Sequence, residues 1–323
     1  MRKIKCLVDA DLLTYECASV AQYKDKSGEW VAKSFDCAST ALDNKIKEIL
    51  EETDSTEEPT LYLTQDKSMY ERDTNRLAKK GVGAYAIAPY TPNFREDIAV
   101  TKPYKGNRQS EKPYHYDNIR EYIRNMYDCK LAVGMEADDL ISIDHNIEYE
   151  DYETVLCSRD KDLRITPGLH YGWGISRKNA EGEVIKGKPF GPKMISRIGY
   201  LDEPKSGTLK GGGLKFFYSQ LITGDTVDNI GGLPRKGGVF AYKLLKDCET
   251  EEELFQATYG AYCDHFNVSD SDSEKDCIEY FKEQAGLLWM IQQLDEDGEL
   301  VHYEFPLDKV RRLRETSEES IDD

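Results

Sequence analysis

The stretch Gly134–Ile141, GMEADDLI, lies in the middle of the chain between segments with helical patterning. It places three carboxylates within four residues, Glu136, Asp138 and Asp139, next to apolar side chains. Glu136 and Asp139 are three positions apart and therefore share one face of a helix. Crowded carboxylates raise one another's pKa unless a cation lies between them, which favours a bound divalent metal ion. The structural alternative is an acidic first helical turn stabilised by the helix macrodipole.

Further carboxylates follow apolar runs elsewhere in the chain. Asp160 and Asp162 follow one run, Asp225 and Asp228 follow another, and Asp9 ends a short run near the N-terminus. Ligands of open α/β sheets bind at the carboxyl ends of strands, so a site is expected where Asp9 and Asp160 lie. Oxygen ligands without histidine suit Mg²⁺ or Mn²⁺ better than zinc. The sequence therefore predicts a divalent metal site.

Length and composition bound the class of protein. The chain has 323 residues, of which 39% are apolar and 32% charged, enough for one large domain or two smaller ones. No apolar run approaches the length of a membrane span, and the one near the N-terminus is too short for a signal peptide. The eight cysteines form no Cys-x-x-Cys pair and are typical of reduced thiols. We expect a cytoplasmic protein with no membrane partner.

The net charge of -18 is unevenly distributed. Residues 159–246 contain 16 Lys and Arg against 8 Asp and Glu, whereas residues 247–323 contain 6 against 23. The acidic end is explained by solvation alone. The basic middle indicates contacts with phosphate groups.

Patterning predicts the secondary structure. Apolar runs predict strands, at 4–8, 60–64, 82–88 and 154–157, and an edge hairpin that pairs 169–173 with 183–185. Helical spacing predicts helices, at 12–21, 38–50, 68–80, 116–127, 216–222, 239–245, 247–262 and 273–294.

Two other stretches suggest nucleic-acid contacts. Residues 231–238, GGLPRKGG, precede a helical segment, and the amide groups at such a helix start can bind phosphate. Residues 104–108, YKGNR, interleave an aromatic ring with cations, which suits stacking on bases and pairing with phosphates. An ordinary exposed loop is the alternative for the second stretch.

Between about residues 4 and 245 the chain resembles the 5′ nucleases, which include flap endonucleases, the 5′→3′ exonuclease domain of bacterial DNA polymerase and bacteriophage relatives. The resemblance rests on five ordered blocks, VDADLLTY (8–15), YKGNR (104–108), EADDLI (136–141), SRDKDL (158–163) and GDTVDNI (224–230). Five blocks at suitable spacing are far more specific than a single motif.

The resemblance implies an α/β fold, PIN-like, with a mostly parallel central sheet, helices on both faces and a helix–three-turn–helix DNA-binding lobe. The implied division has three parts, a nuclease domain over 1–215 with an arch near 90–130, a helical lobe over 216–300 and an acidic tail over 301–323.

The resemblance also implies a reaction and a site. Two Mg²⁺ ions, with Mn²⁺ as a substitute, would activate water to cleave a phosphodiester into 5′-phosphate and 3′-hydroxyl products. The implied metal ligands are carboxylates: Asp9, Glu136, Asp138, Asp139, Asp160, Asp162, Asp225 and Asp228, with Asp160 and Asp162 also counted as catalytic. Lys105 would approach the scissile phosphate. The implied DNA-binding residues are Arg95, Tyr104, Lys105, Arg108, Arg235 and Lys236.

The sequence departs from the family pattern at two places. The acid expected after the second core strand is replaced by Gln65 and Asp66, followed by an insertion of roughly twenty residues. The family's Gly-Ile-Gly-x-Lys turn reads RKGGV at 235–239, so the family's K⁺ site there remains an open expectation.

The sequence is compatible with several functions. The expected substrate is DNA with 5′ ends or flaps, and a ribonuclease H-like relative that removes RNA primers from RNA–DNA hybrids is the nearest alternative. A PIN-type ribonuclease lacks the glycine-rich turn, and a catalytically silent DNA-binding relative would have lost a ligand or Lys105. Calcium binding without catalysis lacks a recognisable Ca²⁺ loop. Protein partners are not indicated.

Overall fold

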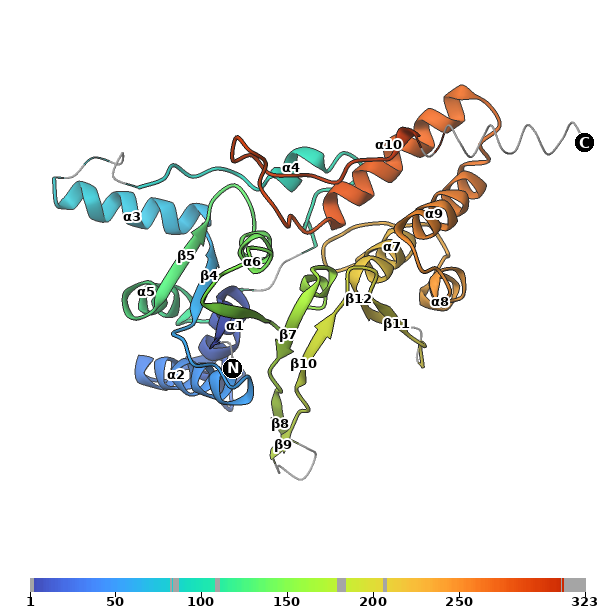
Figure 1. Ribbon diagram of the computed structural model, residues 1–323. Helices are drawn as coiled ribbons and strands as arrows, with labels where there is room; N and C mark the ends of the chain where they lie inside the picture. The colour runs from blue at the N-terminus through green and yellow to red at the C-terminus, as the bar shows by residue number, and fades with distance from the viewer. Residues whose placement is uncertain are drawn as a thin grey trace, which may run out of the picture.

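The centre of the fold is a six-stranded sheet in the order β10-β7-β6-β1-β4-β5 (Figure 1). The computed structural model describes residues 3–81, 83, 87–107, 111–178, 184–205, 208–308 and 310. Neighbouring strands are parallel except for β10, which runs antiparallel to β7 at one edge. This confirms the mostly parallel sheet expected from the sequence. The strands are β1 (Lys3–Asp9), β4 (Thr60–Thr64), β5 (Asp128–Ala132), β6 (Tyr152–Cys157), β7 (Gly168–Gly172) and β10 (Phe190–Ile195).

Helices cover both faces of this sheet. In β1, Cys6 and Val8 face one hydrophobic cluster and Leu7 faces another, because successive side chains of a strand point to opposite faces. Both faces are buried, which explains why the strand reads as a continuous apolar run. The cluster around Cys6 is closed by α1 (Ala10–Val20), α2 (Phe35–Glu52) and α5 (Tyr116–Met126). The opposite face carries α6 (Ala137–His145).

A helical lobe continues the second hydrophobic cluster beyond the sheet (Figure 1). It consists of α7 (Gly213–Thr223), α8 (Gly238–Leu245), α9 (Glu251–Phe266) and α10 (Ser271–Leu288). The chain after α10 folds back onto this lobe, where the rings of Tyr303 and Phe305 pack against Phe281. The boundary expected at residue 301 therefore falls inside packed structure, and residues 311–323 lie outside the described part of the chain.

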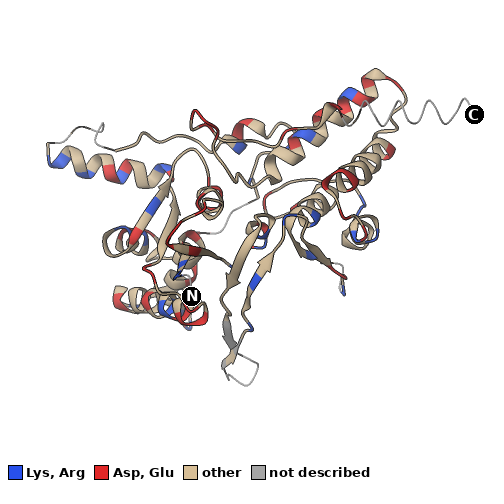
Figure 2. Cartoon of the chain, in the orientation of Figure 1, with Lys and Arg blue, Asp and Glu red and all other residues tan. Residues whose placement is uncertain are grey.

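The remaining elements are short or peripheral. They are β2 (Gln22–Lys24), β3 (Trp30–Ala32), α3 (Lys67–Lys79), α4 (Phe94–Ile98), the 3₁₀ helix η2 (Asp162–Ile165), β8 (Ser176–Lys178), β9 (Val184–Lys186), β11 (Tyr200–Asp202) and β12 (Lys210–Gly212). Charges of both signs alternate along α3 and α10 (Figure 2), as is typical of solvated helix faces. No helix within the described residues is both long and apolar enough to span a bilayer.

One strand prediction needs correction, and one observed strand was not predicted. The expected edge hairpin is wrong in its pairing, because β7 pairs with β10 while β9 pairs with β8. The strand β5 was not expected, because its sequence DCKLA carries charges that break the apolar run. The strand expected at 82–88 falls largely on residues outside the described ranges.

Candidate active site

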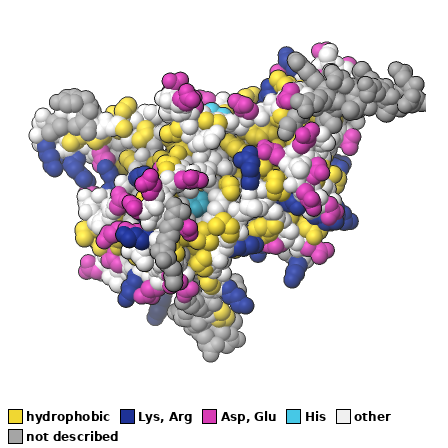
Figure 3. All heavy atoms as spheres, in the orientation of Figure 1, with side chains coloured by type: hydrophobic (Ala, Val, Ile, Leu, Met, Phe, Trp, Pro, Cys, Tyr) yellow, Lys and Arg dark blue, Asp and Glu magenta, His cyan; other side chains and the backbone are white. Residues whose placement is uncertain are grey.

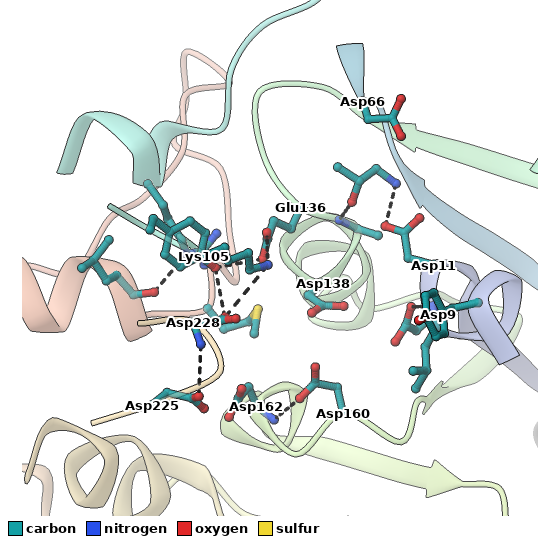
Figure 4. Close-up of a pocket in the computed structure, with 18 of the residues that line it drawn as sticks. Asp9, Asp11, Asp66, Lys105, Glu136, Asp138, Asp160, Asp162, Asp225 and Asp228 are labelled. Carbon is teal, nitrogen blue, oxygen red and sulfur yellow. Dashed lines mark hydrogen bonds and ion pairs between the residues drawn. The ribbon is translucent and has the colours of Figure 1, made fainter. Parts of the chain in front are cut away.

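Seven of the eight predicted metal ligands line one cavity of about 490 Å³ (Figure 4). They are supplied by segments far apart in the sequence: Asp9, Glu136, Asp138, Asp160, Asp162, Asp225 and Asp228. Tyr104 and Lys105 line the same cavity. The end of β1, the start of α6, the loop after β6 and the loop after α7 thus meet at the carboxyl edge of the sheet.

Asp9 is held at the junction of β1 and α1. One of its oxygens accepts a hydrogen bond from the Leu12 amide at 3.2 Å, which caps α1, and the other accepts the Ser158 hydroxyl at 2.7 Å. Burial, outweighing these hydrogen bonds, raises the pKa of Asp9 to about 7, and the nearby Asp11 and Asp160 charges add to the rise. The buried carboxylate therefore lacks a compensating positive charge.

The start of α6 carries the central acids. Burial, followed by the charges of Asp9, Asp160 and Glu136, raises the pKa of Asp138 well above its ordinary value. Glu136 instead accepts a hydrogen bond from the Tyr104 hydroxyl at 3.2 Å and forms an ion pair with Lys105. The same helix start thus holds one acid with a lysine partner and one acid crowded by other carboxylates.

The eighth predicted ligand, Asp139, has another role. It is fully buried and forms a two-pronged ion pair with Arg95, at 2.6 and 2.8 Å. Its oxygens also accept the backbone amides of Glu136 and Ile291. All of its accepting positions are occupied within the protein, so the prediction of Asp139 as a metal ligand is corrected. The prediction that Arg95 binds DNA is corrected with it, because the Arg95 side chain is only 3% exposed.

The third group of acids surrounds a lysine that the sequence reasoning missed. Lys161 Nζ lies 2.8 Å from Asp162 and 2.6 Å from Asp225. Burial alone would raise the pKa of Asp225, but the Lys161 contact and backbone hydrogen bonds lower it. Burial and the Asp160 charge raise the pKa of Asp162 to about 6 in spite of Lys161. The available signal was the position of Lys161 between the two acids of the SRDKDL block.

Lys105 is fixed by its backbone as well as by its side chain. Its φ of 55° lies in the left-handed region, which a residue with a Cβ rarely adopts. Its amide donates to the Asp228 carbonyl at 3.0 Å, and Asn229 donates to the Pro103 carbonyl at 2.9 Å. These bonds hold the 103–105 segment against the loop after α7. The strained conformation directs the Lys105 ammonium into the cavity toward Glu136 (Figure 4).

The glycine-rich turn follows Ile230, which lines the cavity, and leads into α8. Gly224 ends α7 with a φ of 68°, and a Cβ there would lie 2.4 Å from the Ile230 carbonyl. Glycine therefore permits the tight loop that presents Asp225. On the turn itself, Arg235 is exposed, and Lys236 is half-buried with its ammonium 4.2 Å from the Phe240 ring centre. Arg108, also predicted to bind DNA, lies outside the described residues.

The two substitutes for the missing family acid have structural partners. Asp66 caps α3 by accepting the Met69 amide at 2.7 Å and forms an ion pair with Lys112 at 2.9 Å. Gln65 is buried and donates to the Ala88 carbonyl. Asp66 lies at the rim of the cavity, apart from the central acids (Figure 4).

The chemistry of the lining fits divalent metal ions. All of the acidic donors are carboxylate oxygens, which Mg²⁺ and Mn²⁺ prefer. Burial and neighbouring carboxylates raise the pKa values of Asp9 and Asp138, so a cation bound between these acids would stabilise their charged forms. Within the described residues, no group of three or more His, Cys, Asp or Glu side chains is already arranged to hold a metal ion. Binding would therefore require these carboxylates to move together around the ion.

Over part of its length the chain is similar in sequence to bacterial DNA polymerases. It is 30% identical over 162 residues to DNA polymerase I of Rhizobium leguminosarum, and 26% identical over 190 residues to DNA polymerase I of Bacillus subtilis (strain 168). These matches cover 48% and 57% of this chain but only 14% and 19% of the polymerases. No protein-family model matches. The chain is thus similar to a minor part of each polymerase.

Solved structures of a bacteriophage T5 protein also match. A 5′-exonuclease with bound zinc aligns over 89% of this chain and all of its own, at 13% identity and a TM-score of 0.46. A flap endonuclease complex with DNA and metal ions aligns over 86% of this chain and 99% of its own, at 14% identity and a TM-score of 0.42.

Proposed function

We propose that this protein is a metal-dependent 5′ nuclease that acts on DNA. The observation that carries the proposal is the meeting of seven carboxylates with Lys105 in one cavity at the carboxyl edge of the sheet. The motifs that resemble 5′ nucleases supply most of these residues. The similarity to bacterial DNA polymerase I is consistent with this class of enzyme.

The proposed metal ligands fall into two groups. Asp9, Glu136, Asp138 and Asp160 mainly serve one ion, and Asp162, Asp225 and Asp228 serve the other. Two divalent ions, Mg²⁺ in the first place, would supply an acidified water and stabilise charge on the phosphate oxygens when bound. The products of hydrolysis are a 5′-phosphate and a 3′-hydroxyl.

Other side chains contact the substrate in this proposal. Lys105 places its ammonium near the scissile phosphate, and Tyr104 stacks on an unpaired base beside the cut. Arg235 and Lys236, with the amides at the start of α8, grip the phosphates of the duplex, with K⁺ a candidate at the same turn. The substrate is DNA with a 5′ end or flap, met in replication or repair in the cytoplasm.

The test is cleavage of a 5′-labelled flap duplex in Mg²⁺ and in EDTA, next to a matched RNA–DNA hybrid. Cutting at the flap junction in Mg²⁺ alone supports a DNA 5′ nuclease. Faster cutting of the hybrid moves the assignment to a ribonuclease H-like primer remover. Binding of both substrates with cutting of neither identifies a catalytically silent relative.

A further inference from the structure

The acids of the cavity are not equally supplied with positive charge. Lys161 bridges Asp162 and Asp225, with its nitrogen 2.8 and 2.6 Å from their oxygens. Within the described ranges, no Lys or Arg nitrogen lies within 4 Å of Asp9 or Asp138. Lys161 therefore occupies Asp162 and Asp225, and Lys105 pairs with Glu136, whereas Asp9 and Asp138 form no ion pair within the described ranges.

Lys161 directly precedes η2, and Asp225 lies in the loop after α7. The ion pair between them therefore joins two segments that are far apart in the sequence. The Lys161 side chain is 46% exposed, so its ammonium can leave the two carboxylates without unfolding the loop.

We propose that Lys161 acts as an internal cation in the half of the site formed by Asp162 and Asp225, and that a divalent ion binds there only when Lys161 moves away. This inference rests on the proposed function. An ammonium within hydrogen-bond distance of both carboxylates repels a divalent ion that would use the same oxygens. The first ion then binds at Asp9 and Asp138, where no such ammonium competes.

The same arrangement links the second ion to the substrate. A phosphate that enters the cavity offers Lys161 a new anionic partner, and Lys161 is partly exposed toward solvent. Movement of the ammonium to the phosphate would release Asp162 and Asp225 for the second ion. The full metal complement would then assemble when DNA is present.

The test is calorimetric titration of Mg²⁺ and of Mn²⁺ into the full-length protein without DNA. The wild type should bind one ion and take up a second at least about tenfold more weakly, given the modest strength of a partly exposed ion pair. Lys161→Met should tighten the second step by about tenfold. Lys161→Arg keeps the positive charge and should leave the second step weak.

Lys275→Met is the matched control. Lys275 forms an exposed pair with Glu279 on α10, at 3.8 Å and 72% exposure, so this change removes one positive charge away from the cavity. Thermal unfolding and circular dichroism establish that each variant is folded, with Lys161→Gln as a second neutral variant.

The outcomes distinguish a failure of the Lys161 proposal from a failure of the proposed nuclease function. Equal affinities of the two ions in the wild type, or an unchanged second step in both neutral variants, overturn the role of Lys161 and leave the nuclease assignment to the cleavage test. Failure of every protein to bind any ion removes the metal site and the proposed function together. A tightened second step that appears equally in Lys275→Met is a general charge effect and overturns the inference.

Discussion

Arg95 and Asp139 form a two-pronged ion pair inside the protein, with nitrogen–oxygen distances of 2.6 and 2.8 Å. Arg95 also donates to the carbonyls of Leu287 and Trp289, while Asp139 accepts the Ile291 amide. The pair therefore joins α4, the start of α6 and the chain after α10. It holds the cavity wall at α6 against the helical lobe.

Breaking this pair should destabilise the protein strongly. Arg95→Met leaves the buried Asp139 carboxylate without a partner and should lower the free energy of unfolding by about 3–5 kcal/mol. Urea unfolding followed by circular dichroism measures the change. The control is Arg197→Met, which removes an exposed ion pair with Glu251 and should lower stability by less than about 1 kcal/mol. Equal losses in the two variants would contradict the role of the buried pair.

Replacement of a central carboxylate should separate chemistry from binding. Asp160→Asn keeps the size of the side chain but removes its charge, and cleavage of the flap duplex should fall by about a hundredfold or more. Duplex binding, measured by fluorescence anisotropy, should be retained. Asp264→Asn on the exposed surface of α9 is the control and should cleave normally. Unchanged turnover in Asp160→Asn would remove the site assignment.

Lys105 should contribute more to the reaction than to affinity. Lys105→Met removes the ammonium next to Glu136 and should lower the single-turnover rate by about 10²–10³, as expected for a group that stabilises developing charge. The Kd for the uncut duplex should change by only a few-fold. Wild-type single-turnover rates in this variant would exclude Lys105 from the reaction.

Two neighbouring histidines, His170 buried and His145 half-buried, should make the fold sensitive to acid. The rings of His145 and His170 lie 5.8 Å apart, and burial lowers their pKa values to about 4 and about 3. The unfolded state binds protons near pH 6.5, where the folded state does not, so stability present above pH 6.5 is lost as the pH falls toward 4. Each histidine should contribute a loss of about 2 kcal/mol between pH 6.5 and 5.

Urea unfolding at a series of pH values gives the slope of the free energy of unfolding against pH. Asp9 and Asp162 titrate in the same range with the opposite sign, because raised acid pKa values favour the folded state at lower pH. The slope is therefore compared between variants. His145→Gln should lose about half of the acid destabilisation, whereas His302→Gln, at an exposed position, should keep it. An identical slope in all three proteins would exclude the histidine pair as the cause of the acid destabilisation.

DNA binding should weaken with salt through the basic residues near α8. Arg235→Ala and Lys236→Ala should each lower the slope of log affinity against log salt by about one, since each removes one phosphate contact. Affinity should fall equally for unrelated duplex sequences. Lys275→Ala should leave the slope unchanged. Lys, Arg, Asp and Glu side chains are interspersed on the described part of the face seen in Figure 3. We therefore expect a few specific cations, and not a broad basic surface, to account for the salt dependence of binding. A slope of log affinity against log salt near zero in the wild-type protein would contradict phosphate binding by these residues.

Much of the architecture was readable from local sequence. The parallel strands β1, β4 and β6 read as apolar runs because both of their faces are buried, and each predicted strand lies within or at the observed one. The strand β5 was missed because it lies at the edge of the sheet, where charged side chains reach solvent. Edge strands lack the two-sided burial that makes a strand visible in sequence.

The sequence alone determined which carboxylates could form a site, because each acidic block follows a strand or starts a helix and strand ends converge in such a sheet. Only the tertiary structure decided what each charge does. Asp139 is next to Asp138 in sequence, yet it pairs with Arg95, 44 positions away. Lys161 reaches Asp225 across 64 positions. Ion pairing depends on distance in space and on burial, and neither quantity is contained in the spacing of residues along the chain.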